Sequence, residues 1–417
     1  MNVAEYIHDM AVRARTAAGE LAKLSTAEKN AALEAIVAAL EKNAAAVKSA
    51  NAVDVENAKK GGLAPAMVDR LTLTDARFRS MVDGVRHVAS LPDPVGETMW
   101  TRERPSGITI NKVRVPFGVV AVVFESRPNV FIDTAALCLK TGNAVVLRGG
   151  KEAIETNKSL ARAVGEGLNS LRPDASVRQS DANVTLGTLR DAIQLVEILE
   201  HEAVTELVRS VGLIDVAIPR GGERLIRAMC EAALIPVLKH YKGVCHVYVD
   251  DEADMAMALD ILDNAKTQRP GVCNAAECLL INRRLAPLFR PMVEAWAKDK
   301  GVTLHENEEG TEYLSLDINV AVVDDYRAAI DFINRHSSHH SECIVTNNAE
   351  RAKEFMRDVD SACVYHNVST RFTDGGEFGM GAEIGISTDK LHARGPMGLE
   401  ELTTYKYTIT GDGVVRK

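Results

Sequence analysis

A short run of apolar residues constrains the fold of this chain more than any other feature. Residues 119–124 read Val-Val-Ala-Val-Val-Phe without a polar interruption, which is typical of a parallel strand covered on both faces. An apolar helical stretch then begins at Pro128 and ends near Gly142, and residues 144–147 form a second apolar strand. Because such connections are right-handed crossovers, this segment predicts a βαβ unit and an α/β fold with a parallel sheet.

The rest of the chain predicts helices at the N-terminus and further α/β units after them. Residues 3–89 carry apolar side chains at spacings of three and four, and Ser25 with Glu28 predicts a capping box. The stretch 100–112 contains a Pro-Ser-Gly turn signal and then alternates, which predicts a β-hairpin. Further strands are predicted at 214–218, 235–238, 244–249, 278–281 and 319–323, and helices at 285–299 and 326–335.

Three other segments have specific interpretations. Asp250 and Asp251 follow a predicted strand and are expected to cap the helix that leads to Asn264. The tail 402–410 alternates as a strand does and is expected to pair with the hairpin. Residues 172–187 are polar, and we interpret them as a surface insertion of unknown purpose.

Composition and charge limit the class of protein. The 417 residues are 46% hydrophobic and 26% charged, enough to bury the cores of two domains. A net charge of -9 argues against nucleic acid or an anionic membrane as a partner. Seven cysteines, an odd number, favour a reducing compartment, and the sequence has neither a signal-peptide pattern nor a run of about 20 apolar residues. We therefore expect a cytoplasmic protein.

Cys273 lies where a reactive thiol is expected. Pro270 and Gly271 predict a loop just before it, and such loops carry chemistry more often than packing. If Lys266 and Arg269 are also close to it in space, they favour the thiolate, which is the form that attacks carbonyl carbon. The alternative is a small buried cysteine, the commoner role of a single cysteine in an intracellular chain.

Four motifs, in order along the chain, carry a resemblance to a known family. They are Glu125-Ser-Arg-Pro-Asn129, Ile218-Pro-Arg-Gly-Gly222, Gln268-Arg-Pro-Gly-Val-Cys273-Asn-Ala-Ala-Glu277 and His340-Ser-Glu342-Cys-Ile344. Through them the chain closely resembles the gamma-glutamyl phosphate reductases of the aldehyde dehydrogenase superfamily. The resemblance implies an aldehyde dehydrogenase-like α/β fold with two parallel-sheet domains and a projecting oligomerisation hairpin.

The resemblance also implies how the chain is divided. An NADP-binding domain would take residues 1–243 with 383–401, and a catalytic domain carrying Cys273 would take 244–382. An oligomerisation arm would consist of 97–115 and 402–417, so a homo-oligomer is expected.

The same resemblance assigns roles to individual residues. Cys273 is the implied nucleophile, and the side-chain amide of Asn129 is the implied donor to the oxyanion that forms when the thiol attacks. Since Asn129 follows a strand and opens a helix, an ordinary N-cap is the alternative. Arg127 or Arg371 is a candidate for holding the substrate's α-carboxylate, although either one also suits a surface salt bridge.

The cofactor site is less usual in sequence. No Gly-x-Gly-x-x-Gly follows any predicted strand, so the common dinucleotide fingerprint is missing. Aldehyde dehydrogenases hold their cofactor differently, and their adenosine-contacting stretch matches residues 146–151 here. The segment 220–222 before a helix would bring backbone amides against a pyrophosphate, although both glycine pairs also suit simple turns. The candidate cofactor-binding residues are Arg148, Gly149, Lys151, Arg220, Gly221 and Gly222.

A histidine-rich segment raises the question of a metal. A site could be drawn from His336, His339, His340, Glu342 and Cys343. Zinc sites normally show tighter paired spacing, and no second Cys/His pair accompanies this segment in the sequence. We therefore expect no metal.

The implied activity is the NADPH-dependent reduction of L-glutamate 5-phosphate to L-glutamate 5-semialdehyde and phosphate through a Cys273 thioester, in proline biosynthesis. Glutamate 5-kinase is the implied functional partner. The alternatives are an oxidising aldehyde dehydrogenase and a non-catalytic scaffold homologue. Oxidising members carry a glutamate base in a stretch that corresponds to 238–243 here, which has no carboxylate; whether His240 replaces that base stays open.

Overall fold

The computed structural model describes residues 2–171 and 187–416, so all but the last residue of the expected 172–187 insertion lies outside the described residues. The chain forms two compact units, each built from more than one segment. Unit 1 contains Met1–Leu238, Met380–Gly385 and Met397–Lys417, and unit 2 contains Lys239–Gly379 and Ile386–Pro396. Within the described ranges, no helix is both long and apolar enough to cross a membrane.

Unit 1 holds a four-stranded parallel sheet in the order β5-β4-β3-β6. Its strands are β3 (Val119–Phe124), β4 (Ala144–Arg148), β5 (Ile193–Leu195) and β6 (Val216–Arg220). Every residue of β3 and β4 is buried, and α6 (Pro128–Lys140) connects these two parallel neighbours. The predicted βαβ unit is therefore confirmed.

Helices make up most of the remainder of unit 1. They are α1 (Val3–Leu21), α2 (Thr26–Lys42), α3 (Ala44–Lys60), α4 (Pro65–Leu71), α5 (Asp75–Ser90), η1 (Lys151–Ala153), α7 (Ile154–Ser170), α8 (Gly187–Arg190), α9 (His201–Arg209) and α10 (Glu223–Ala232). The Ser25 hydroxyl accepts from the amide of Glu28, whose carboxylate accepts from the amide of Ser25. The predicted capping box at the start of α2 is confirmed.

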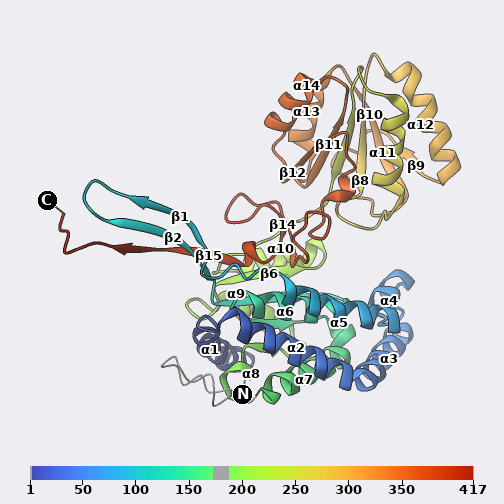
Figure 1. Ribbon diagram of the computed structural model, residues 1–417. Helices are drawn as coiled ribbons and strands as arrows, with labels where there is room; N and C mark the ends of the chain where they lie inside the picture. The colour runs from blue at the N-terminus through green and yellow to red at the C-terminus, as the bar shows by residue number, and fades with distance from the viewer. Residues whose placement is uncertain (1, 172–186, 417) are drawn as a thin grey trace. The chain divides into compact units, whose positions relative to one another are not determined.

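A separate three-stranded antiparallel sheet joins distant parts of the chain in the order β1-β2-β15 (Figure 1). Its strands are β1 (Thr98–Glu103), β2 (Thr109–Pro116) and β15 (Thr403–Thr410). β15 pairs with β2 along its whole length, from Thr403 opposite Pro116 to Thr410 opposite Thr109. The predicted hairpin and its pairing with the tail are confirmed.

Unit 2 contains a six-stranded parallel sheet in the order β12-β11-β7-β8-β10-β9. Its strands are β7 (Cys245–Val249), β8 (Ala276–Asn282), β9 (Thr303–His305), β10 (Asp317–Val323), β11 (Ser341–Val345) and β12 (Cys363–His366). Its helices are α11 (Met255–Thr267), α12 (Ala286–Lys300), α13 (Tyr326–His336), α14 (Ala349–Asp358) and η2 (Thr370–Phe372). Two short strands, β13 (Gly385–Ser387) and β14 (Gly395–Met397), pair near the borders of the units, and η3 (Glu400–Leu402) precedes β15.

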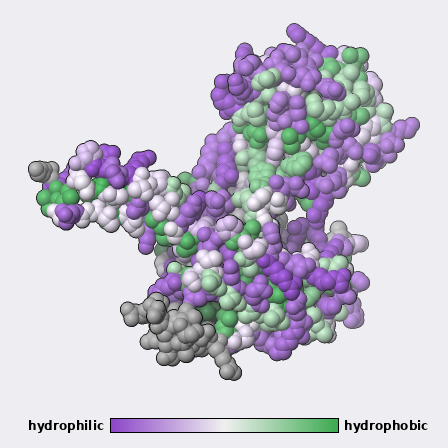
Figure 2. All heavy atoms as spheres, in the orientation of Figure 1, coloured by the Kyte–Doolittle hydropathy of each residue, from purple (hydrophilic) through white to green (hydrophobic). Residues whose placement is uncertain are grey.

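Alternating side chains of the unit 2 strands build two cores. Leu279 packs with α11 and α12 in one cluster, and its neighbour Leu280 packs with α13 and α14 in the other. This alternation follows from the two-residue period of a strand and explains why β8 is buried on both faces along its whole length. The residues of both cores are buried, and hydrophilic residues are mixed with hydrophobic ones on the surface in view in Figure 2.

Two local predictions are wrong. Residues 235–238 form one isolated bridge, Val237 with Ala217, instead of a strand, and Pro236 has no N–H with which to extend a ladder. The N-cap of α11 is Asp254, whose carboxylate accepts from the amides of the following turn, and not Asp250 or Asp251.

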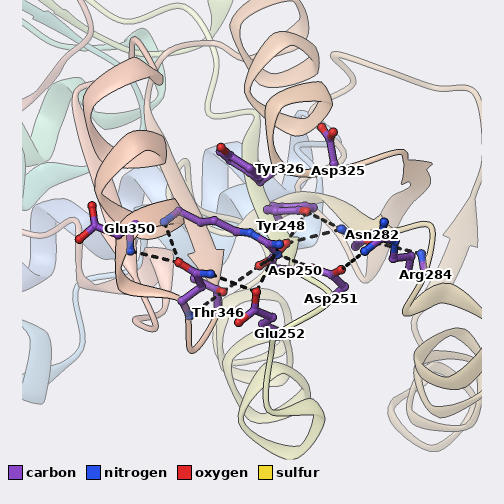
Figure 3. A network of polar contacts seen from close by, with 12 residues as sticks. Tyr248, Asp250, Asp251, Glu252, Asn282, Arg284, Asp325, Tyr326, Thr346 and Glu350 are labelled. Carbon is purple, nitrogen blue, oxygen red and sulfur yellow. Dashed lines mark hydrogen bonds and ion pairs between the residues drawn. The ribbon is translucent and has the colours of Figure 1, made fainter.

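Asp250 instead lies at the centre of a buried polar network (Figure 3). Its carboxylate accepts from the Tyr248 hydroxyl at 2.9 Å and from the Thr346 hydroxyl and the Arg351 guanidinium, both at 2.8 Å. These contacts join the ends of β7 and β11 to α14 and fix the carboxyl edge of the unit 2 sheet. Cys273 lies at the opposite, amino edge.

Candidate active site

Cys273 lies in unit 2 on the loop between α11 and β8, as predicted. It is not part of a disulfide, and it is partly exposed. The next residue, Asn274, is buried and anchors the loop. Its side-chain amide donates to the Thr373 carbonyl at 2.8 Å, and its backbone carbonyl accepts from the Thr370 hydroxyl at 2.7 Å. The loop therefore holds its backbone in place beside an accessible thiol.

Two histidines lie beside Cys273. His240 precedes β7 and His340 directly precedes β11, and β11, β7 and β8 are neighbours in the sheet. One ligand atom from each of the three side chains lies within 4.8 Å of the other two. The close approach of the His240 segment requires Gly243, because a Cβ there would overlap the Cys273 carbonyl.

His340 is electrically neutral in this environment. Burial lowers its pKa to about 3, and the charge of His240 acts in the same direction. Sequence reasoning included His340 in a motif but did not place it beside Cys273. The position of His340 immediately before a strand was visible in the sequence. Placing it beside Cys273 also requires the strand order, which the sequence does not reveal.

A second thiol lies close to the first. Cys245 is buried at the start of β7, and its Sγ donates to the Cys273 carbonyl at 3.2 Å. Burial raises the pKa of Cys245 well above its ordinary value, so it stays protonated. Of these two neighbouring cysteines, Cys273 is the one suited to act as a nucleophile.

Lys266 does not have the expected role. It is completely buried, and its Nζ donates to Oε2 of Glu277, also buried, at 2.6 Å. Burial lowers the pKa of Lys266 and raises the pKa of Glu277. Because Glu277 balances the charge of Lys266, we do not assign Lys266 as the cation that favours the thiolate.

Arg371 lies in the same unit as Cys273. Its Nε donates to the side-chain oxygen of Gln268 at 2.8 Å, and its Nη1 donates to that of Asn274. Burial lowers the pKa of Arg371, and the nearby charge of Arg269 adds to this effect. Arg371 thus connects the two ends of the Cys273 loop.

The other predicted catalytic and substrate residues lie in unit 1, at the start of α6. Arg127 occupies the N-cap position, where its side chain makes no capping bond, and Asn129 follows two residues later. Both side chains are exposed. The Asn129 amide donates to Oδ2 of Asp133 at 2.8 Å, and burial raises the pKa of Asp133 to about 6. The N-cap alternative for Asn129 is therefore wrong.

Arg148 ends β4 and is 8% exposed. Its guanidinium donates to the carbonyls of Leu199 at 2.7 Å and Gly149 at 3.0 Å, and burial lowers its pKa. Nε of Arg148 and both amide atoms of Asn157 are buried and have no hydrogen-bond partner among the residues described. Lys151 is exposed at the start of η1. These polar groups suit a ligand at the carboxyl end of β4, where open α/β sheets bind them.

The segment 220–222 connects β6 to α10. The Gly222 amide donates to Oε2 of Glu125 at 3.0 Å, and a Cβ on Gly221 would lie 2.7 Å from the Glu125 carboxyl carbon. Arg220 lies against Gly385, where an added Cβ would lie 3.2 Å from its Nη1. A carboxylate therefore occupies the helix N-terminus at which a pyrophosphate was expected.

No protein-family model matches the chain. The curated gamma-glutamyl phosphate reductase of Moorella thermoacetica is 49% identical, with 100% of each chain covered. That of Aquifex aeolicus is 47% identical, covering 99% of this chain and 97% of its own.

Solved structures agree with these relatives. The gamma-glutamyl phosphate reductase of Thermotoga maritima has a TM-score of 0.93 at 39% identity, covering 99% of this chain and 100% of its own. An acetylating aldehyde dehydrogenase from Geobacillus thermoglucosidasius has a TM-score of 0.69 at 15% identity, covering 100% and 98%, and is alike in fold. The predicted aldehyde dehydrogenase-like fold and oxidoreductase class are confirmed. The chain belongs to the gamma-glutamyl phosphate reductase family.

Proposed function

We propose that the chain reduces L-glutamate 5-phosphate to L-glutamate 5-semialdehyde and phosphate in proline biosynthesis, with NADPH as reductant and Cys273 as nucleophile. One observation carries the proposal: a partly exposed cysteine on an anchored loop, beside two histidines, in a chain 49% identical over its full length to a curated reductase of this name.

The chemistry begins at the Sγ of Cys273. The thiolate attacks the acyl carbon, an S–C bond forms, and the C–O bond to phosphate breaks, which leaves a thioester. Bound nicotinamide cofactor supplies the reducing equivalent. The resulting thiohemiacetal collapses, the semialdehyde leaves, and Cys273 regains its thiolate. We assign the Asn129 amide as the donor that stabilises the oxyanion in these steps, a role commonly worth several kcal/mol.

A member of this family uses a nicotinamide cofactor, and the choice of NADPH is part of the proposal. Arg148 is assigned to the 2′-phosphate because a guanidinium matches the geometry of phosphate oxygens. Gly149 and Lys151 follow it, and a side chain on Gly149 would overlap the Asn157 amide, so only glycine lets the Asn157 amide approach the backbone this closely. Arg220, Gly221 and Gly222 remain assigned to the pyrophosphate, which requires the Glu125 carboxylate to leave the Gly222 amide.

Arg371 or Arg127 is assigned to the α-carboxylate of the substrate. Arg371 is favoured, because it contacts Gln268 and Asn274 on either side of Cys273. An arginine presents donors in a fixed fork that matches a carboxylate.

The runner-up activity is that of an oxidising aldehyde dehydrogenase. Residues 238–243 contain no carboxylate that could activate water. His240 lies near Cys273, so it is the one side chain of this stretch that we retain as a candidate base.

The assembly and the cellular setting are also proposals. We assign cofactor binding to unit 1, the nucleophile to unit 2, and oligomerisation to an arm of residues 97–115 and 402–417. Exposed Tyr405, Tyr407 and Ile409 on β15 support this arm as an interface. Functional pairing with glutamate 5-kinase in the cytoplasm is the expected context.

The test is NADPH oxidation with L-glutamate 5-phosphate generated in place by a glutamate kinase. Cys273→Ser should abolish turnover, because a serine alkoxide is far less accessible than a thiolate at neutral pH. Cys230→Ser is the matched control, since Cys230 is also partly exposed but lies on α10. Near-normal turnover by Cys273→Ser would refute the covalent route.

A further inference from the structure

The side chains of Cys273, His240 and His340 form a cluster with the composition of a metal site. One ligand atom from each lies within 4.8 Å of the other two. A tetrahedral zinc ion with ordinary bond lengths needs its ligand atoms roughly 3.3–3.6 Å apart. At most about 1.5 Å of closure therefore remains, and rotation of the two partly exposed side chains, Cys273 and His240, can supply it.

His340 supplies an independent sign that this cluster accepts a ligand. It is completely buried, and its Nε2 has no hydrogen-bond partner among the residues that the structure describes. A buried polar atom without a hydrogen-bond partner lowers the stability of the folded state, and coordination to a bound cation would remove that penalty.

Outer contacts hold the His340 ring in the manner usual for a metal ligand. Its Nδ1 lies 2.9 Å from the Ser341 hydroxyl, which lies 2.5 Å from the Thr373 hydroxyl. The Thr373 hydroxyl in turn lies 2.7 Å from that of Tyr365. Such partners orient a ligating imidazole, and a hydroxyl that accepts the Nδ1 proton leaves Nε2 able to bind a cation.

His240 is oriented by a similar contact. Its Nδ1 lies 2.7 Å from the carbonyl oxygen of Ile386. Since a carbonyl only accepts, Nδ1 carries the proton, and Nε2 is the acceptor nitrogen of the neutral ring. A Cys, His, His set of this kind favours Zn²⁺ and related borderline-soft ions over Mg²⁺ or Ca²⁺.

We propose that Cys273, His240 and His340 bind a thiophilic divalent cation, with water in the fourth position. Binding takes the Cys273 thiol to a metal-bound thiolate, and the released proton passes to solvent. This set shares only His340 with the histidine-rich segment of the sequence. The ion would also occupy the nucleophile, so Zn²⁺ would inhibit reversibly; that consequence, unlike the binding itself, rests on the proposed function of Cys273.

Cobalt(II) titration of the full chain, without substrate, tests the binding. We expect one equivalent of Co²⁺ to produce tetrahedral d–d bands and a thiolate-to-cobalt charge-transfer band, which Zn²⁺ abolishes and excess Mg²⁺ does not. His240→Gln should weaken binding about a hundredfold or more, and Cys273→Ser should remove the charge-transfer band. His336→Gln, from the nearby helix α13, is the matched control and should bind as wild type.

Other outcomes of the titration are equally decisive. Wild-type affinity in His240→Gln, or cobalt binding without a charge-transfer band, would overturn the proposal. His340 is buried, so His340→Gln is interpreted only where circular dichroism shows an unchanged fold, and His240→Gln carries the test otherwise. Inhibition of NADPH oxidation by Zn²⁺, reversed by a chelator, is measured separately. A cobalt site in an inactive protein would support the metal site and refute the function.

Discussion

The side-chain amide of Asn129 donates to Oδ2 of Asp133 at 2.8 Å, one turn further along α6. This bond fixes the orientation of an otherwise exposed amide. If Asn129 stabilises the oxyanion, Asp133 is the residue that positions it. Asp133→Ala should lower kcat about tenfold or more while leaving the KM for NADPH unchanged, because donor preorganisation acts in the transition state. Asp133→Asn keeps an oxygen acceptor and should retain most of kcat; a wild-type kcat in Asp133→Ala would contradict this role.

Asp133 also predicts a pH dependence of stability. Burial raises its pKa from 3.8 to about 6, which outweighs the Asn129 hydrogen bond and the charge of Arg220. Since the folded-state pKa is above the unfolded one, the contribution of this carboxyl to stability is fully present below pH ~4 and is lost as pH rises through about 6. Urea unfolding of Asp133→Asn should lack this decline, which amounts to at most about 3 kcal/mol. If the free energy of unfolding changes with pH in the same way in the variant and the wild type, the assignment of this pH dependence to Asp133 is refuted.

Arg371 and Arg127 can be separated by substrate kinetics. Arg371→Lys keeps the charge but loses the fork of donors, so we expect the KM for L-glutamate 5-phosphate to rise about tenfold to a hundredfold with the KM for NADPH unchanged. Arg127→Lys is the matched comparison. A raised KM in Arg127→Lys alone would transfer the carboxylate assignment to Arg127.

Cofactor choice tests the assignment of Arg148. Arg148 is buried, and its guanidinium already donates to two carbonyls. Arg148→Ala should weaken the binding of NADPH about tenfold or more beyond its effect on the binding of NADH, because only NADPH carries the 2′-phosphate. Fluorescence titration of both cofactors measures this difference. Equal losses for the two would show a structural role for Arg148 instead.

The sequence predicted the architecture well, because the information is local. The uninterrupted strand at 119–124, the capping box at Ser25 and the alternating tail 402–410 each determine their own structure, and all three are confirmed. The loop carrying Cys273 was likewise predictable from Pro270 and Gly271.

What the sequence could not give depends on strand order and burial. His340 lies 67 residues beyond Cys273, and only the adjacency of β11, β7 and β8 brings both to one edge. Lys266 looked like a cation available to the thiol, yet burial opposite Glu277 balances its charge. Asp250 looked like a helix cap, but its buried carboxylate instead accepts from Arg351 and Thr346.

Running the reaction backwards tests the central claim most directly. The claim is that Cys273 forms a thioester that phosphate, and not water, resolves, since 238–243 contain no carboxylate to activate water. The measurement is NADPH formation from L-glutamate 5-semialdehyde and NADP⁺, with and without inorganic phosphate. We predict steady NADPH formation only when phosphate is present. Steady formation in phosphate-free buffer, with free glutamate accumulating, would contradict the account and identify an oxidising dehydrogenase.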